Sequence, residues 1–529
     1  MIIPDPGPGA IRFGILYGGA ALENWQIRCL EQLASVPGVR AEVSIAPGPS
    51  RVPLGGAWAE LPNIPIELSP GSCTVAPLAA SSIDRLRDCQ LEFILCFADG
   101  VLPLDILDAP RHGIWRYQLG DWVSYRGSPQ GFWEVFDGCA VSAALLVRVQ
   151  PDPDAIVVLR EGFLRTRALS VRKNREQLLA RFTHWPAEVC RDIKLGRSKE
   201  ICAKPALRTG AAVRPPPALW HRCVLAARIA ARAAATGFRA LFRHDQWNIG
   251  IIDRPIAQFL TMSVLPEIEW LPATRRSELR ADPFGTLYQG RPTILCEYFS
   301  YRDNRGFIVA IDPERGAAGA RVQIGPDRPV HLSYPFLFEA GGRLLCVPES
   351  SAAKEIVLYE VERFPDRWVK AATLIAGRAF ADATVFQYQG RWWLAASDVA
   401  DKGANSELHL WFAEAPRGPW EAHPGNPVKI DVRSARPAGA PFWVDGALYR
   451  PAQDCSSTYG ARVIINRVLA LTPTEFCEEV AATVNPDPAG KYPAGLHTLS
   501  TLGDRTLIDG KRSVFVGAEF FRVLRHYLR

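Results

Sequence analysis

The sequence predicts two domains of different class: an N-terminal α/β domain with a mostly parallel sheet, and a C-terminal all-β domain that forms a five-bladed β-propeller. Three observations support this prediction. The chain has 529 residues, too many for one hydrophobic core. Short apolar runs alternate with helical patterns up to about residue 200. Beyond residue 245, one pattern of short strands and turns recurs five times.

The N-terminal α/β domain is predicted over residues 10–200. An apolar run at 11–17 ends at Gly18 and Gly19, and helical spacing of apolar residues follows over 23–33. The alternation continues with apolar runs at 91–97, 102–107 and 113–117. Such an order predicts a parallel sheet that binds ligands at the carboxyl ends of its strands. No GxGxxG motif occurs, so we expect no dinucleotide.

Several segments of this domain follow one another in a familiar order: 113–118 (Gly-Ile-Trp-Arg-Tyr-Gln), 125–129 (Tyr-Arg-Gly-Ser-Pro), 132–138 (Phe-Trp-Glu-Val-Phe-Asp-Gly), 154–158 (Asp-Ala-Ile-Val-Val) and a helix over 170–193. This order resembles the formyltransferase family, which includes methionyl-tRNA and sugar N-formyltransferases. The resemblance covers most of residues 10–195 and implies a Rossmann-type fold.

The resemblance also implies three catalytic groups: an Asn that positions the formyl carbonyl, a His that assists proton transfer, and an Asp that tunes the His. In the motif G-x-x-N-x-H, Arg116 stands at the Asn position and Gln118 at the His position, and Asp154 alone matches the acid. Glutamine cannot carry a proton near pH 7, and arginine is permanently charged. We therefore expect a degenerate site without formyl transfer or a folate cofactor. It is kept for structure, or Arg116 binds a phosphate or carboxylate.

A linker and a basic helix are predicted over residues 204–245. Lys204, Pro205 and the proline run at 215–217 mark a break in composition, so each half is expected to fold by itself. The helix over 218–242 places Leu219, Cys223, Ala226 and Ala230 on one stripe, and carries Arg222, Arg228, Arg232, Arg239 and Arg243. This small stripe favours packing against a neighbouring domain, and peripheral contact with an anionic membrane is the alternative.

The C-terminal domain, residues 246–529, repeats a start motif, a strand, a turn usually containing Gly, and a second strand. The start motifs lie 52, 48, 59 and 56 residues apart, at 281–284, 333–336, 381–384, 440–442 and 496–499. Residues 247–253 precede the first motif and are expected to complete the last blade and close the ring.

Polar residues occupy equivalent places in these units, where inner strands line a central, solvated channel. We predict that Asp282, Glu349 and Asp382 are catalytic, and that the substrate contacts Glu297, Asp398, Arg436, Gln453, Asp454 and His497. Glycoside cleavage needs an acid and a base or nucleophile on opposite faces of the sugar, roles open to Asp282 with Glu349 or Asp382. The alternative is that individual acids cap turns or pair with nearby arginines.

A second resemblance rests on residues 333–336 (Ser-Tyr-Pro-Phe), 347–350 (Val-Pro-Glu-Ser), 418–420 (Gly-Pro-Trp), 435–439 (Ala-Arg-Pro-Ala-Gly), 448–455 (Leu-Tyr-Arg-Pro-Ala-Gln-Asp-Cys) and 458–460 (Thr-Tyr-Gly). Over about residues 245–515 the chain resembles the N-terminal domain of plant glucosamine inositolphosphorylceramide transferase. That domain is similar to arabinanase- and invertase-type propellers. The resemblance implies a sugar-handling propeller. A separate glycosyltransferase domain follows in the plant protein, and its activity is not expected here.

Composition and charge limit the partners. The net charge of +6 is small for this length, so no nucleic acid is expected, and no run of about 18 apolar residues predicts a transmembrane segment. The first residues lack the order of a signal peptide, and twelve scattered cysteines contain no CxxC pair. These features predict a cytoplasmic protein with reduced thiols and no metal site.

Three functions remain open at this point. The first is a carbohydrate-active enzyme that hydrolyses or transfers a glycosyl unit, in glycan or polysaccharide metabolism. The second is a non-catalytic module that binds a glycan or a sugar nucleotide. The third is an amino-sugar N-formyltransferase, which Arg116 and Gln118 disfavour.

Overall fold

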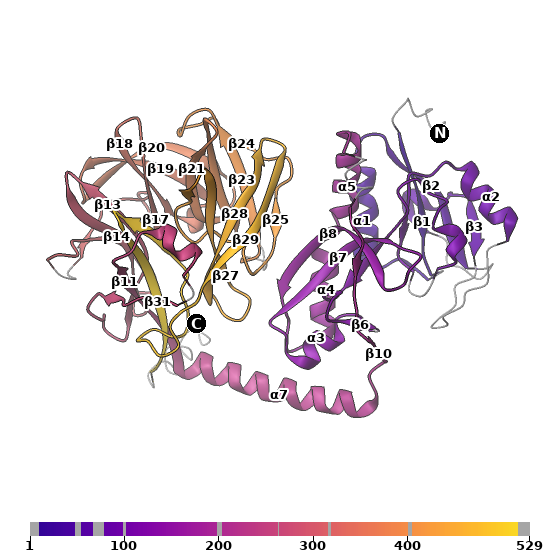
Figure 1. The fold of residues 1–529 in the computed structure, drawn as a ribbon, viewed down its shortest axis with the longest axis horizontal. Helices are drawn as coiled ribbons and strands as arrows, with labels where there is room; N and C mark the ends of the chain where they lie inside the picture. The colour runs from indigo at the N-terminus through magenta and orange to yellow at the C-terminus, as the bar shows by residue number, and fades with distance from the viewer. Residues whose placement is uncertain are drawn as a thin grey trace. The chain divides into compact units, whose positions relative to one another are not determined.

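The computed structural model describes residues 10–18, 20–47, 54–66, 79–98, 102–127, 129–197, 204–262, 264–315, 319–399 and 405–516. The chain divides into two compact units, Met1–Gly162 with Thr166–Ile229, and Phe163–Arg165 with Ala230–Arg529. The first is α/β and the second is a five-bladed propeller, as the sequence predicts (Figure 1).

The α/β unit is built on an eight-stranded sheet in the order β3-β2-β1-β4-β5-β7-β8-β9. Its strands are β1 (Ile11–Leu16), β2 (Val39–Pro47), β3 (Asn63–Ile66), β4 (Phe93–Cys96), β5 (Ile114–Leu119), β7 (Val141–Val149), β8 (Ala155–Arg165) and β9 (Leu207–Arg208). Strands β1 to β5 pair in parallel, while β7 is antiparallel to β5 and β9 is antiparallel to β8. The small strands β6 (Arg126–Gly127) and β10 (Val213–Arg214) pair separately.

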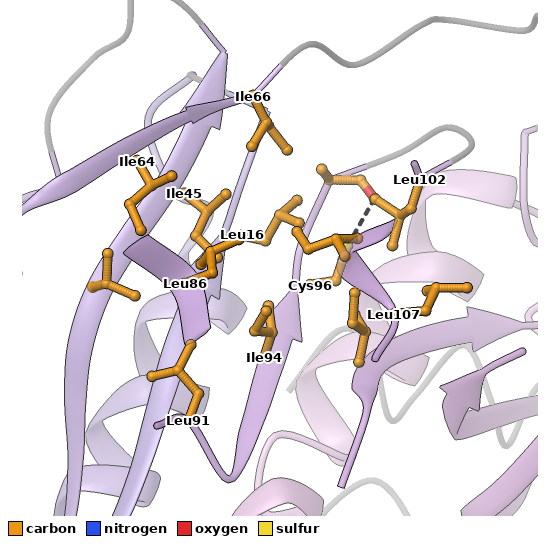
Figure 2. Close-up of a cluster of buried hydrophobic side chains, with 14 residues drawn as sticks. Leu16, Ile45, Ile64, Ile66, Leu86, Leu91, Ile94, Cys96, Leu102 and Leu107 are labelled. Carbon is orange, nitrogen blue, oxygen red and sulfur yellow. Dashed lines mark hydrogen bonds between the residues drawn. The ribbon is translucent and has the colours of Figure 1, made fainter. Parts of the chain in front are cut away.

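Apolar side chains from the parallel strands form the core of this unit. Leu16, Ile45 and Ile94 of neighbouring strands pack with Leu86 of α2 (Ala80–Asp88), and all four are at most 1% exposed (Figure 2). The run at 102–107 contributes Leu102 and Leu107 to the same cluster around the short helix η2 (Leu104–Ile106). A second short helix, η1 (Gly56–Trp58), precedes β3.

In the described part of this unit the other α-helices are α1 (Asn24–Ala34), α3 (Phe132–Asp137), α4 (Val171–Arg181) and α5 (Trp185–Lys194). Helix α1 begins with a capping box between Glu23 and Gln26. The sequence predicts one helix over 170–193, and the structure instead has two. Pro186 lies in the first turn of α5, where its missing N–H is tolerated, so a new helix starts there.

Helix α7 (Leu219–Phe242) confirms the predicted basic helix. Its only buried side chain among the described residues is Leu225, which packs with Val224 and Ile229 against α3. The stripe expected to pack, which includes Cys223 and Ala226, is exposed instead. No helix in the described part of the chain is long and apolar enough to cross a membrane.

The propeller consists of five sheets. Blade 1 contains β13 (Glu278–Tyr288), β14 (Arg291–Ser300), β15 (Arg305–Ile311) and β16 (Ala320–Arg321); blade 2 contains β17 (Ser333–Ala340), β18 (Arg343–Glu349), β19 (Glu355–Arg363) and β20 (Arg367–Ala376). Blade 3 contains β21 (Phe380–Tyr388), β22 (Arg391–Asp398), β23 (Glu407–Ala413), β24 (Glu421–Ala422) and β25 (Lys429–Ile430). Blade 4 contains β26 (Phe442–Val444), β27 (Ala447–Asp454), β28 (Arg462–Thr472) and β29 (Glu475–Val484).

Blade 5 closes the ring by joining the two ends of the propeller sequence. It combines β30 (Leu499–Leu502) and β31 (Arg505–Phe515) with β11 (Arg243–Ile252) and β12 (Glu269–Trp270). Strand β11 pairs antiparallel with β31 along its whole length, from Arg243 opposite Phe515 to Ile252 opposite Thr506. The prediction that residues 247–253 complete the last blade is therefore confirmed.

Candidate functional site

The candidate site is a group of acidic side chains from blades 1 to 3. We call Asp282 on β13, Glu349 at the end of β18 and Asp382 on β21 the acid cluster. Strands β13, β17 and β21 each contain a bulge at the start motif. The bulges give Asp282, Tyr334 and Asp382 positive φ angles of 53°, 43° and 54°. Residues other than glycine are strained in this conformation, so its recurrence at three equivalent places indicates that the surrounding blades constrain these bulges.

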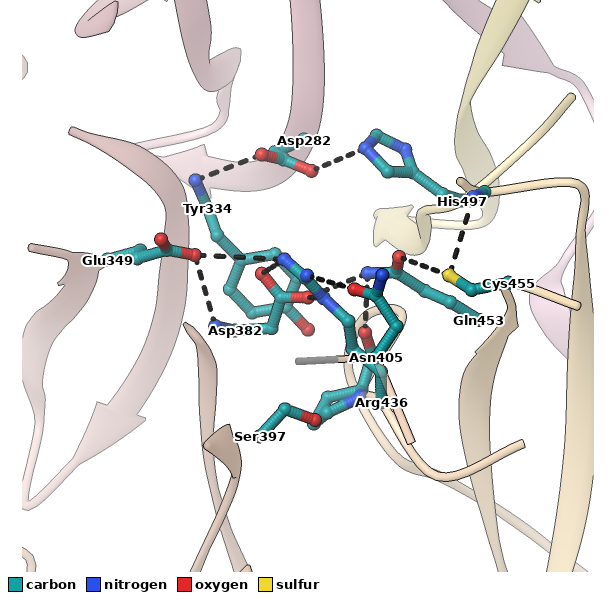
Figure 3. Close-up of polar contacts among 12 residues, drawn as sticks. Asp282, Tyr334, Glu349, Asp382, Ser397, Asn405, Arg436, Gln453, Cys455 and His497 are labelled. Carbon is teal, nitrogen blue, oxygen red and sulfur yellow. Dashed lines mark hydrogen bonds and ion pairs between the residues drawn. The ribbon is translucent and has the colours of Figure 1, made fainter. Parts of the chain in front are cut away.

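Asp382 lies at the centre of an ion-pair network (Figure 3). Its two carboxylate oxygens accept hydrogen bonds from Nε and Nη2 of Arg436, at 2.5 and 3.2 Å, and Gln453 Nε2 donates to one of them at 2.6 Å. Arg436 also donates to Asn405 Oδ1 at 2.7 Å. The side chain of Asp382 is only 3% exposed. This network fixes the carboxylate and neutralises its charge.

Glu349 ends β18 beside Asp382. Its Oε2 accepts from the backbone N–H of Asp382 at 3.3 Å, and its Oε1 accepts from Ser351 Oγ at 3.0 Å. Arg436 Nη2 is farther away, 4.0 Å from Oε2. Burial raises the pKa of Glu349 to about 8; the neighbouring Asp382 adds to the rise and Arg436 opposes it. Glu349 is therefore mostly protonated at pH 7.

Asp282 belongs to a second, connected group. Its Oδ2 accepts from the N–H of Tyr334 at 3.2 Å and its Oδ1 from Thr498 Oγ1 at 3.1 Å, while His497 Nε2 lies 3.5 Å from Oδ1. Burial raises the pKa of Asp282 to about 6, and the charge of His497 limits the rise. Asp282 is mostly ionised at pH 7, when Glu349 is mostly protonated.

His497 links Asp282 to Asp509, whose Oδ2 lies 2.5 Å from His497 Nδ1. Burial alone would lower the pKa of His497, but Asp509 and Asp282 together raise it. The imidazolium therefore balances the two carboxylates. Among the described residues, two separate sets of side chains could hold a metal ion by their spacing, since the ligand atoms within each set lie within 4.8 Å of one another. They are Asp282, His497 and Asp509, and Asp398, Glu407 and His409. His497 pairs with both acids of the first set; in the second set His409 pairs with Glu407, and Asp398 pairs with Arg378. We assign no ion to either set.

Of the predicted substrate contacts, the structure brings Arg436, Gln453 and His497 to the acid cluster. Glu297 adjoins the cluster, because it lies opposite Ala281, next to Asp282, in the β13–β14 pair. Burial, together with the charges of Asp282 and Glu349, raises the pKa of Glu297 well above its usual range. Asp398 instead pairs with Arg378, and Asp454 lies 3.2 Å from Arg462 Nε. These two acids have arginine partners, which was the alternative left open by the sequence.

The sequence predicts that these acids line a solvated channel, but their side chains are largely buried. The side chains of Asp282 and Glu349 are 8% and 11% exposed. Hydrogen bonds and ion pairs among the blades take the place of water around these groups. Substitutions that break a pair will therefore also affect stability.

Sequence reasoning missed Asp509, Thr498 and Asn405. A signal for Asp509 was present: in all five units an acid follows the apolar part of the second strand, as Glu297, Glu349, Asp398, Asp454 and Asp509 do. Thr498 and Asn405 had no comparable signal, because both lie in irregular segments outside the strands.

The predicted site of the α/β unit is only partly assembled. Arg116 and Gln118 lie on β5, where Arg116 Nη2 donates to Cys96 Sγ at 3.4 Å and Gln118 Oε1 accepts from Gln130 Nε2 at 3.2 Å. Asp154 pairs with Arg126 Nη1 at 2.7 Å and its side chain is 57% exposed. Gln118 is therefore bonded to another amide and Asp154 to an arginine, and neither partner can pass a proton between them.

We expect no formyl transfer by this unit. Supplied with a formyl-tetrahydrofolate donor and a panel of amino sugars, the protein should form no N-formyl product, because Gln118 cannot exchange a proton near pH 7. Product analysis by mass spectrometry tests this. Formylation that disappears on Asp154→Asn, but not on Asp105→Asn at an exposed position of the same unit, would contradict it.

The propeller is similar in sequence to known proteins. Residues 267–493 match the family described as glucosamine inositolphosphorylceramide transferase 1, N-terminal. Two proteins named glucosamine inositolphosphorylceramide transferase 1 are similar. The protein from Oryza sativa subsp. japonica is 37% identical over 207 residues, which cover 38% of this chain and 28% of the relative. The protein from Arabidopsis thaliana is 32% identical over 269 residues, which cover 47% of this chain and 34% of the relative. The predicted resemblance of the propeller is confirmed. The matched region spans about a third of each relative.

Solved structures give weaker likenesses. A family 117 glycoside hydrolase from Zobellia galactanivorans has a TM-score of 0.32 and 15% identity, covering 51% of this chain and 91% of that one. A thermostable family-43 glycoside hydrolase has a TM-score of 0.31 and 15% identity, and the match covers 42% of this chain and 84% of that one. Glycinamide ribonucleotide transformylase 1 from Symbiobacterium toebii has a TM-score of 0.28 and 15% identity, covering 36% and 90%. With TM-scores this low, they support no inference about function.

Proposed function

We propose that this protein is a carbohydrate-active enzyme, and that its propeller transfers or hydrolyses a glycosyl unit at the acid cluster. One observation carries the proposal: three buried carboxyl groups from neighbouring blades lie together, and burial raises the pKa of Glu349 to about 8 and that of Asp282 to about 6. Near pH 7 one is an acid and the other a base. Acid/base catalysis of glycosyl chemistry needs this division between two carboxyl groups.

The residues suit separate roles. Glu349 would protonate the leaving oxygen of the glycosidic bond, and Asp282 would accept a proton from water or from an acceptor hydroxyl. Asp382, fixed by Arg436 and Gln453, would position sugar hydroxyls by charge-assisted hydrogen bonds. The sugar as ligand is supported by the matched family, whose name specifies a glucosamine transferase.

A second candidate is a module that binds a glycan or sugar nucleotide without turnover. Its specific support is the dense pairing of the cluster: Asp382 holds three hydrogen bonds from Arg436 and Gln453, and its side chain is 3% exposed. A group so fully satisfied in the free protein suits recognition as well as catalysis.

The pH dependence of turnover tests the enzymatic proposal. We expect kcat/KM for an aryl glycoside or sugar-nucleotide substrate, found by screening, to be highest between about pH 6 and 8. Below pH 6 Asp282 becomes protonated and no longer acts as a base; above pH 8 Glu349 loses the proton it must donate. The Glu349→Gln variant should lack the alkaline limb. An unchanged alkaline limb in that variant would contradict the assignment, and absence of turnover across the screen with saturable binding would favour the second candidate.

A further inference from the structure

The motif at 458–460 (Thr-Tyr-Gly) lies in the segment between β27 and β28 of blade 4, next to the acid cluster but outside it. Gly460 has a positive φ of 56°. A Cβ atom at this position would lie 2.6 Å from Cβ of His497 and 2.8 Å from Cη2 of Trp247. Only glycine therefore allows the segment to lie this close to His497.

Lys511 on β31 of blade 5 holds the backbone of this segment. Its ammonium group donates hydrogen bonds to Thr458 Oγ1 at 3.1 Å and to the backbone carbonyl of Tyr459. The side chain of Lys511 is 1% exposed, and Asp245 Oδ2 lies 3.7 Å from its Nζ. A lysine is rarely buried unless hydrogen bonds and an opposite charge compensate it, so these contacts fix the position of the segment.

The ring of Tyr459 lies beside both connected groups of the acid cluster. The guanidinium carbon of Arg436 is 5.1 Å from the centre of the ring, and Arg436 pairs with Asp382. The ring of His497 is 5.2 Å away at an interplanar angle of 79°, and His497 pairs with Asp282. Tyr459 therefore contacts the cationic partner of each of these two acids.

The hydroxyl of Tyr459 is an available polar group at this place. Tyr459 is partly exposed, and among the described residues no group forms a hydrogen bond with its hydroxyl. Burial raises the pKa of Tyr459 well above its usual range; Arg436 opposes the rise, and Asp382 and Asp282 add to it. The phenol is therefore neutral at pH 7 and can both donate and accept. Asp382, in contrast, already accepts three hydrogen bonds within the protein.

We propose that Tyr459 binds a hydroxyl group of the sugar at the acid cluster through its own hydroxyl, and that Lys511 is a positioning residue that holds Tyr459 there. A sugar hydroxyl both donates and accepts, so it complements a neutral phenol. A neutral ligand is favoured because Arg436 and His497 already balance the nearby carboxylates. The inference rests on the proposed sugar ligand of the cluster, and it holds with or without turnover.

Tyr459→Phe tests the contact, because it removes the hydroxyl and keeps the ring beside Arg436 and His497. Titration calorimetry with a panel of para-nitrophenyl glycosides measures Kd, and initial rates on the same panel measure KM and kcat. Tyr459→Phe should raise Kd and KM about tenfold, as expected for one lost hydrogen bond, with kcat and the melting temperature nearly unchanged.

The matched control is Tyr449→Phe, on β27 of the same blade. Tyr449 is also partly exposed, and its hydroxyl likewise forms no hydrogen bond with the described residues. Its ring stacks on Phe442, with ring centres 5.7 Å apart, and not on the cluster. This variant should bind each glycoside as the unchanged protein does.

Lys511→Met tests the positioning role. It should also raise Kd, although Lys511 itself is not expected to touch the sugar. Because the effect acts through Tyr459, Lys511→Met should raise Kd less in the Tyr459→Phe background than in the unchanged protein. A lysine that only stabilises the fold would lower the melting temperature in both backgrounds and leave Kd unchanged, which would contradict the positioning role.

The outcomes separate this proposal from the enzymatic function. Full affinity of Tyr459→Phe for a glycoside that binds the unchanged protein would overturn the contact, even where turnover is observed. Binding without turnover, weakened by Tyr459→Phe, would support the contact and contradict only the enzymatic function. If no glycoside of the panel binds the unchanged protein, the contact with Tyr459 is refuted as well.

Discussion

Replacing Glu349 by glutamine is expected to reduce glycosyl turnover by about 10²–10⁴-fold while the melting temperature at pH 7 stays near that of the unchanged protein. The amide cannot donate the proton that the proposed role requires. It does preserve shape: its carbonyl can accept from the N–H of Asp382 in place of Oε2, and its NH2 can donate to Ser351 Oγ in place of Oε1. Because the pKa of Glu349 is raised to about 8, the carboxyl is already mostly neutral at pH 7, so little charge interaction is lost. Initial rates and thermal melts measure the two effects.

Glu339→Gln is the matched control, because Glu339 lies exposed on β17 of the same blade. It should leave both quantities unchanged. A large fall in melting temperature for Glu349→Gln with turnover retained would show a structural role. Asp282→Asn does not separate catalysis from stability, because it removes a carboxylate that pairs with His497. Both the rate and the stability of this variant should fall.

Removing the charge of Glu478 is expected to produce the largest loss of stability, about 3–5 kcal/mol and roughly 10 °C in melting temperature. Glu478 on β29 accepts from Arg450 Nη2 at 2.6 Å and Nε at 2.9 Å, and from Lys429 Nζ at 2.8 Å. Both Arg450 and Glu478 are nearly inaccessible, with side chains 3% and 2% exposed. Glu478→Gln would leave the buried arginine without its counter-charge.

The pH dependence of this contribution has a definite sign. Burial alone would raise the pKa of Glu478, but Arg450 and Lys429 lower it below the usual value. The stabilisation is therefore present above the unfolded pKa and is lost as pH falls through the folded pKa. Denaturation of Glu478→Gln and of its exposed neighbour Glu479→Gln at several pH values measures this. Glu479→Gln should change stability little. Equal melting temperatures for the two variants would refute the assignment.

The repeat predicted the propeller well because each blade is specified locally. Start motif, glycine turn and second strand lie close together in sequence, and Asp282, Glu349 and Asp382 occupy the positions that converge. The choice of partner depends on residues far away in sequence. Glu349 and Asp398 both end a second strand, yet one adjoins Asp382 and the other pairs with Arg378. Strand periodicity does not determine which arginine reaches which acid.

In the α/β unit, the parallel strands followed from the alternation of apolar runs, but β7 and its neighbours extend the sheet in ways that pattern does not specify. The position of Asp154 in the motif suggested a role beside Gln118. Its pairing with Arg126 depends on the path of residues before β8, which sequence spacing alone does not fix.

The location of a bound sugar distinguishes an acid cluster that acts on carbohydrate from one that only holds the blades together. A crystal structure of the Glu349→Gln variant with a glycoside identified in the turnover screen should be determined. We expect the sugar within hydrogen-bond distance of Asp282 and Asp382, with its glycosidic oxygen facing the side chain at position 349. A sugar bound elsewhere, with the acid cluster occupied only by its own ion pairs, would contradict glycosyl chemistry at this cluster.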